Sequence, residues 1–156
     1  MTRAAAWSLH AAALAVGGTG LVYGWMRYFA EPVDELALVN HPLEPLLQHL
    51  HVLFAPLLVF AVAAIWGEHV WRRVRSGFAP RRPTGLALFA TFFPMALSGA
   101  WVQVAEGELS RTLAIWTHGV SGTLWCAAYM VHLATRAAAA RASLSSGVGR
   151  PGPRSS

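Results

Sequence analysis

The sequence predicts an all-α integral membrane protein, a four-helix bundle that runs up-down-up-down with both termini cytoplasmic. The chain of 156 residues is 55% hydrophobic and only 12% charged, which is too apolar for an ordinary soluble domain. Its charged residues enclose four uncharged stretches, each about 35 Å long as a helix and so able to cross a hydrocarbon core of about 30 Å. Its arginines, moreover, are divided unevenly between the two ends of these stretches.

Each predicted helix lies between charges or helix-breaking residues. The four helices are expected at residues 4–26, 45–67, 84–105 and 112–135. The connections are expected to be an acidic outer loop at 31–44, a basic inner turn at 72–83 and a short outer turn at 106–111. Pro56 is expected to kink the second helix without ending it. Residues 1–142 would form one membrane domain, and residues 143–156, rich in Ser, Gly, Pro and Arg, a disordered cytoplasmic tail.

Arginine decides the predicted orientation, because the chain contains no lysine. Cytoplasmic loops of membrane proteins carry an excess of positive charge, and a cytoplasmic N-terminus places ten arginines inside and two outside. The inner ones are Arg3, Arg72, Arg73, Arg75, Arg81, Arg82, Arg136, Arg141, Arg150 and Arg154, and the outer ones are Arg27 and Arg111. The net charge of +5 therefore reflects topology and is poor support for nucleic-acid binding.

Four histidines lie inside the predicted spans at two matched depths. His118 and His132 are fourteen residues apart on one helix, which puts them within about 40° of each other and about 21 Å apart along the axis. His51 lies as far below the outer boundary as His118, and His10 lies near the inner boundary, close to the depth of His132. Imidazoles in an apolar bundle are costly and usually functional, and a b-type haem needs one imidazole on each face of its iron. The sequence therefore predicts two non-covalent haem b groups, because it contains no C-x-x-C-H motif for covalent attachment.

The other histidines leave two assignments open. His49 is about 200° around the helix from His51, so only one of them faces the interior, and His51 is preferred. His69 could replace His10 opposite His132, although it lies just beyond the apolar span. His41 belongs to the outer loop and is expected to be solvated.

Several motifs resemble the prokaryotic cytochrome b561-type dihaem family, which includes membrane subunits of nickel-iron hydrogenases and formate dehydrogenases. The segment from Ile115-Trp116-Thr117-His118 to Val131-His132 is similar to the family's last common helix. Leu50-His51-Val52-Leu53-Phe54-Ala55 and Leu97-Ser98-Gly99 are similar to its second-helix and third-helix motifs. The resemblance implies that His51 and His118 ligate the outer haem and that His10 and His132 ligate the inner one. Ala11, rather than the family's frequent tryptophan, follows His10.

The expected function is electron transfer across a bacterial inner membrane. The resemblance implies exchange with a membrane quinone or quinol at one end and with an extracytoplasmic or membrane redox protein at the other. The chain would then be an electron-transfer subunit of an oxidoreductase rather than an independent enzyme. Two haem-free alternatives use the same spans: a transporter or proton-conducting bundle with the histidines as a relay, and a structural membrane anchor.

Overall fold

The computed structural model describes residues 2–32, 34, 37–75 and 82–147, and these are almost entirely helical, without a strand. The elements are α1 (Arg3–Tyr28), α2 (Glu44–Ile65), the π-helix η1 (Trp66–Trp71), α3 (Arg72–Arg75), α4 (Arg82–Val104) and α5 (Glu108–Gly147). The prediction of an all-α chain is therefore confirmed. Three of the arginines that were predicted to lie on the inner side are outside the described residues: Arg81, Arg150 and Arg154.

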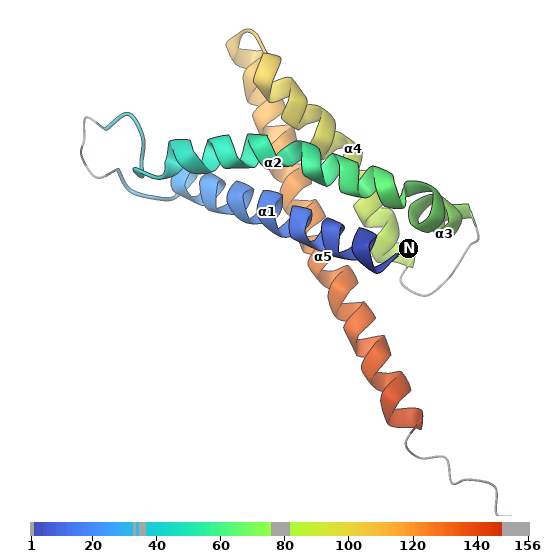
Figure 1. Ribbon diagram of the computed structural model, residues 1–156. Coiled ribbons are helices and arrows are strands. Elements are labelled where there is room, and N and C mark those ends of the chain that lie inside the picture. The colour runs from blue at the N-terminus through green and yellow to red at the C-terminus, as the bar shows by residue number, and fades with distance from the viewer. Residues whose placement is uncertain (1, 33, 35–36, 76–81, 148–156) are drawn as a thin grey trace, which may run out of the picture.

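The helices pack as two hairpins, α1 with α2 and α4 with α5. The second hairpin closes through a short turn in which Gly107 has a φ of +78°, a left-handed conformation that glycine adopts without steric cost. Figure 1 shows the α1–α2 hairpin crossing the α4–α5 hairpin, with the long C-terminal part of α5 extending away from the other helices. The up-down-up-down four-helix bundle with both termini cytoplasmic stays a prediction.

One hydrophobic core holds the two hairpins together where they cross. Its buried residues come from all four long helices: Ala12, Ala13, Val16, Leu58, Ala61, Val62, Phe92, Met95, Trp125 and Tyr129. Trp125 and Tyr129 stack in α5 with ring centroids 5.1 Å apart. A β-carbon at Gly17 of α1 would lie 3.2 Å from Cys126 Sγ of α5, so this glycine lets the hairpins approach closely.

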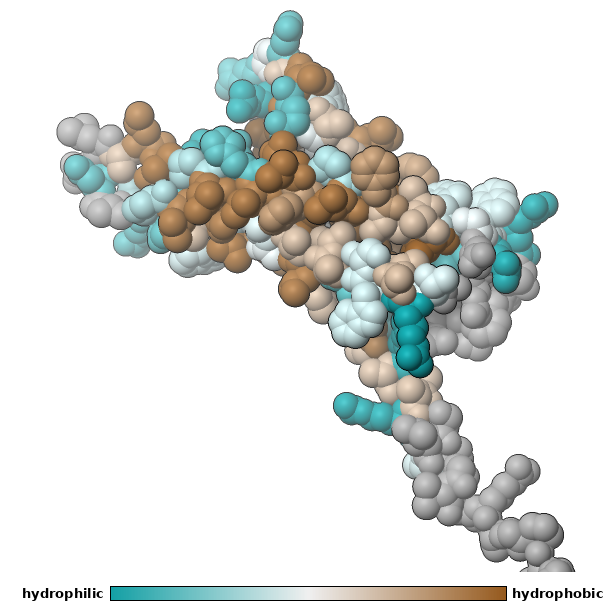
Figure 2. Space-filling view, viewed as in Figure 1, coloured by the Kyte–Doolittle hydropathy of each residue, from teal (hydrophilic) through white to brown (hydrophobic). Residues whose placement is uncertain are grey.

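The outer surfaces of the helices carry many large apolar side chains. Exposed examples from each long helix are Leu14, Leu53, Phe60, Leu97 and Val120. Figure 2 shows apolar residues covering much of the α1–α2 hairpin, with hydrophilic residues gathered mainly toward the ends of the helices. Three helices among the described residues are long and apolar enough to cross a membrane: Arg3–Tyr28, Glu44–Ile65 and Pro83–Val104. The fourth predicted span, 112–135, lies within α5, and its crossing stays a prediction.

Three helix boundaries differ clearly from the predicted ones, and one of them is the start of α5, which lies at Glu108 instead of 112. Helical structure continues through η1 and α3 to Arg75, where the sequence predicted a turn from residue 72. α5 continues to Gly147, where the sequence predicted a helix end near 135, because Ala137–Ala142 consists of alanine and arginine, which are strong helix formers. Residues 143–147 of the predicted tail are therefore helical, and residues 148–156 lie outside the described residues.

An ion pair between a buried glutamate and an exposed arginine closes the loop end of the α1–α2 hairpin. Glu44, in the first turn of α2, is only 3% exposed, and its Oε1 lies 3.1 Å from Arg27 Nη1 at the end of α1. The backbone N–H of Asn40 donates to Glu44 Oε2 at 3.2 Å, and the Asn40 amide donates to Arg27 O at 2.9 Å. The α2 N-terminus also favours a carboxylate at this position. The three residues therefore join the loop to both helices.

We expect Glu44→Gln to destabilise the folded protein by about 1 to 3 kcal/mol, because a buried carboxylate that accepts two hydrogen bonds loses its charge. Thermal unfolding in detergent, followed by circular dichroism, measures the change. Glu108→Gln is the matched control, since Glu108 also lies in the first turn of its helix but is exposed. Equal stability losses in the two variants would contradict the structural role of the ion pair.

Candidate cofactor site

Two histidines from different hairpins face each other where the hairpins cross. His51 lies on α2 and His118 on α5, and their ring centroids are 5.8 Å apart with the ring planes at 66°. Both side chains are half-buried. The sequence predicts this pair from the equal depth of the two residues, and the structure brings the two rings together.

A backbone carbonyl of the partner helix in the same hairpin orients each ring. His51 Nδ1 lies 3.0 Å from the Val16 carbonyl oxygen of α1, and His118 Nδ1 lies 2.9 Å from the Met95 carbonyl oxygen of α4. A carbonyl oxygen only accepts, so each Nδ1 carries the proton and donates it. The lone pair of each neutral imidazole is then on Nε2, which is the arrangement of a metal-binding histidine.

A glycine makes room for each ring. A β-carbon at Gly20 of α1 would lie 2.6 Å from His51 Cε1, and a β-carbon at Gly99 of α4 would lie 2.9 Å from His118 Cε1. Both distances are shorter than real β-carbon contacts allow. The two rings therefore occupy positions that exist only because residues 20 and 99 lack side chains.

The second predicted pair is bonded to hydroxyl groups instead. His10 Nδ1 is hydrogen-bonded to the Tyr129 hydroxyl of α5, and the ring of Trp7 lies edge-on with its centroid 6.2 Å away. His132 Nδ1 lies 2.9 Å from Thr84 Oγ1 of α4. Among the described residues, His10 contacts the Tyr129 hydroxyl and His132 contacts the Thr84 hydroxyl.

An open groove lies beside His10, between α1 and α5. Its volume is about 550 Å³, and its polar lining consists of Arg3, His10 and Arg136. Trp7 and Leu133 provide apolar walls. Two guanidinium groups beside an apolar wall suit an anionic group on a flat or apolar molecule.

The remaining histidines lie apart from the central pair. His49 is exposed, as expected from its position on α2 relative to His51. His69 lies half-buried in η1, and His41 Nδ1 accepts a hydrogen bond of 3.1 Å from the Leu43 backbone N–H in the outer loop. The part of the chain that the structure describes has no group of three or more His, Cys, Asp or Glu residues that could hold a metal ion. The donor set is therefore a pair of imidazoles and not a multidentate metal centre.

Sequence reasoning did not identify the two carbonyls as parts of the site, and it left open whether Gly20 and Gly99 serve helix packing or make room for a cofactor. A signal for them exists in the sequence, since Gly20 and Gly99 each lie six residues before the outer end of an uncharged stretch. That is the depth at which His51 and His118 were placed. A glycine and a histidine at one depth on consecutive helices predict a close contact.

Comparisons of the chain with protein-family models, with curated proteins and with solved structures find no match. The resemblance to dihaem cytochromes therefore stays a prediction.

Proposed function

We propose that this chain is a membrane cytochrome that carries electrons across the bilayer through two non-covalently bound b-type haems. The observation that carries the proposal is the pair His51 and His118. Both rings donate Nδ1–H to a carbonyl, and both leave Nε2 as the lone-pair nitrogen. They come from opposite hairpins and lie side by side where the hairpins cross, so they would hold one haem iron between them.

The residues present fit such a group. With metal–nitrogen bonds of about 2 Å, two imidazoles on opposite faces of one metal have centroids about 6 Å apart. The centroids of His51 and His118 are 5.8 Å apart. When bound, haem supplies an iron that gains and loses one electron without breaking a bond. The chain's own residues hold it: the carbonyls set the ring tautomers, and the glycines set the ring positions.

The same contacts make a proton relay less suitable for this pair. A histidine that passes protons must exchange them at both ring nitrogens. Here a backbone carbonyl oxygen accepts the Nδ1 proton of each ring. The Nδ1–oxygen distance is 3.0 Å for His51 and 2.9 Å for His118.

The inner haem is proposed at His10 and His132. In this arrangement His10 donates its Nδ1 proton to the Tyr129 hydroxyl and keeps the Nε2 lone pair for iron. Arg3 and Arg136 line the groove beside His10, and their charges suit the carboxylates that a haem carries. The fourteen-residue spacing of His118 and His132 on α5 would separate the two irons by about 21 Å along the helix.

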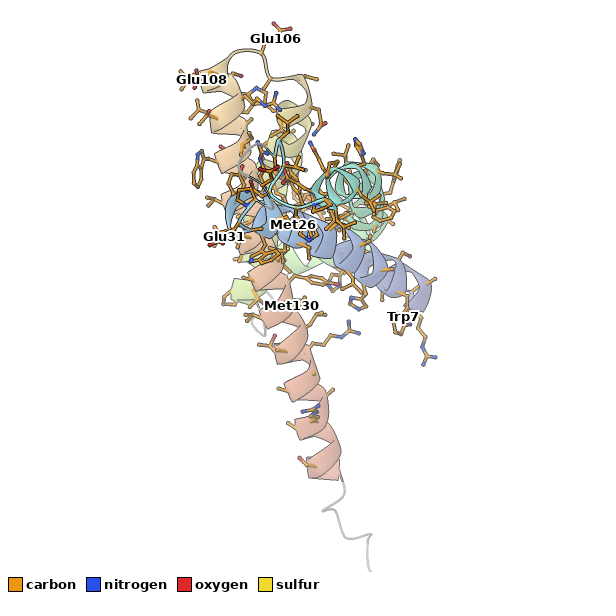
Figure 3. All side chains as sticks on the ribbon, turned by 90° about the vertical axis from the view of Figure 1, so that its left-hand side faces the viewer. Trp7, Met26, Glu31, Glu106, Glu108 and Met130 are labelled. Atoms are coloured by element: carbon orange, nitrogen blue, oxygen red, sulfur yellow. The ribbon has the colours of Figure 1, made fainter. Side chains whose placement is uncertain are left out.

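The proposed setting is a bacterial inner membrane that four helices cross, with both termini cytoplasmic. The exposed acidic residues Glu31, Glu106 and Glu108 lie at the hairpin ends that would face outward, as Figure 3 shows for the connections after α1 and after α4. Each of these acidic hairpin ends, which point in different directions in Figure 1, suits a basic extracytoplasmic or membrane redox protein as partner. A membrane quinone is the proposed partner of the other end, so the chain would serve a larger oxidoreductase as its electron-transfer subunit.

A pyridine haemochrome assay on the detergent-purified chain tests the proposal. We expect about two b-type haems per chain and a reduced-minus-oxidised spectrum typical of two-histidine ligation. A colourless chain, purified from cells with ample haem, would contradict the proposal and leave the transporter and the anchor as the remaining functions.

A further inference from the structure

In the first hairpin, a hydroxyl group shares the carbonyl that orients His51. Thr19, the residue before Gly20, donates from Oγ1 to the Ala15 carbonyl oxygen at 2.6 Å and reaches the Val16 carbonyl oxygen at 3.2 Å. Val16 O is also the acceptor of His51 Nδ1–H at 3.0 Å. The same hydroxyl lies 3.5 Å from His51 Nδ1 itself. Thr19 is therefore in direct contact with the group that orients this imidazole.

The second hairpin repeats this arrangement around His118. Ser98, the residue before Gly99, is hydrogen-bonded from Oγ to the Pro94 carbonyl oxygen and reaches the Met95 carbonyl oxygen at 3.2 Å. Met95 O is the acceptor of His118 Nδ1–H at 2.9 Å. Ser98 is buried. A hydroxyl, a glycine, a shared carbonyl and an imidazole thus occur twice, once on each side of the site.

We infer that Thr19 and Ser98 are positioning residues that raise the redox potential of the haem held between His51 and His118, an inference that rests on the proposed function. A carbonyl oxygen has two lone pairs, and one already accepts the helix N–H four residues on. The hydroxyl proton therefore competes with the imidazole Nδ1–H for the second lone pair of the carbonyl oxygen. A weaker hydrogen bond from Nδ1–H to the carbonyl makes the imidazole a poorer electron donor to iron. Poorer donation favours the reduced metal.

Hydroxyl groups that donate to a carbonyl of their own helix are common in apolar helices. What distinguishes Thr19 and Ser98 is that each shares its acceptor carbonyl with an imidazole. Thr91 of α4 makes the same pair of contacts, with the carbonyls of Ala87 at 2.7 Å and Leu88 at 3.5 Å. Ser8 of α1 donates to the Ala4 carbonyl at 2.7 Å. Their acceptor carbonyls are therefore not those of Val16 and Met95, which accept from His51 and His118. These two residues are matched controls on the same two helices.

The experiment is an optical redox titration of the haem-loaded full-length chain in detergent. Thr19→Val and Ser98→Ala remove the hydroxyls, and the double variant removes both. We expect each single variant to shift the midpoint of one haem to a more negative potential, with a larger shift of that same haem in the double variant. Thr91→Val and Ser8→Ala are expected to leave both midpoints unchanged, and Thr19→Ser and Ser98→Thr to restore the parent value.

The outcomes separate this inference from the proposed function. A haem-loaded chain whose midpoints stay unchanged or become more positive in both hydroxyl-free variants would overturn the inference and leave the proposed function standing. A wild-type chain without haem would overturn both. If Thr19→Val fails to fold, Ser98→Ala decides alone, since the second hairpin carries the same contacts.

Discussion

Replacing His51 with alanine is expected to remove the haem nearer the outer surface and leave the inner one, so that the haem content falls by about half. His51 supplies one of the two neighbouring imidazoles that would hold this haem, and alanine offers no ligand in its place. The haemochrome assay measures the loss per chain. The reduced-minus-oxidised spectrum of the remaining haem should keep its two-histidine form, because His10 and His132 are unchanged.

His49→Ala is the matched control for this variant. His49 lies two residues away on α2 but is exposed, whereas His51 faces His118. Both haems should remain in the control. Loss of a haem in His49→Ala with retention in His51→Ala would reverse the assignment of the two histidines and contradict the central pair described here.

Gly20→Ala is expected to weaken haem binding at the outer site by about 10- to 100-fold, the usual cost of disturbing a group that orients a metal ligand. The added methyl carbon would lie 2.6 Å from His51 Cε1, so the ring must move away from its position opposite His118. Because the atom in the way belongs to a side chain, the ring can shift without unfolding α1. Haem titration of the apoprotein, followed by its Soret absorbance, measures the affinity.

Gly18→Ala provides the control on the same helix, because a β-carbon at Gly18 meets nothing within 4 Å. This variant should bind haem as the parent chain does. On the second hairpin, Gly99→Ala and Gly85→Ala form an equivalent pair, with a 2.9 Å contact to His118 Cε1 at Gly99 and no contact at Gly85. Unchanged haem affinity in both Gly20→Ala and Gly99→Ala would show that the glycines do not position the ligands.

The elements of the fold could be predicted from local patterns. Charges at Arg3 and Arg27 enclose the first helix, and the structure extends it only to Tyr28. Prediction was poorer at the inner end, where η1 and α3 continue helical structure and α5 runs to Gly147. Charge boundaries mark where a membrane span can end, but helix propensity decides where the helix itself ends, and alanine and arginine continue it in water.

The candidate site, too, could be predicted only in part from the sequence. Counting residues from charged boundaries places His51 and His118 at one depth, and the structure finds their rings in contact. The same count pairs His10 with His132, and this pair stays a prediction, since the contacts described for them are with Tyr129 and Thr84. Depth along a helix is one coordinate, and the rotation of each helix about its axis is a second one that depends on packing.

Three features follow from the sequence alone: the apolar helices, the unequal distribution of arginine, and the imidazoles at two depths. Each depends only on composition and spacing along one chain segment. Only the tertiary structure decides that the hairpins cross, that the Val16 and Met95 carbonyls accept the imidazole protons, and that Gly20 and Gly99 make room for the rings. These contacts join residues between 19 and 35 positions apart in the chain, for example Gly99 with His118 and Val16 with His51. Their formation depends on how closely two helix backbones approach, and this distance is set by the packing of all four helices.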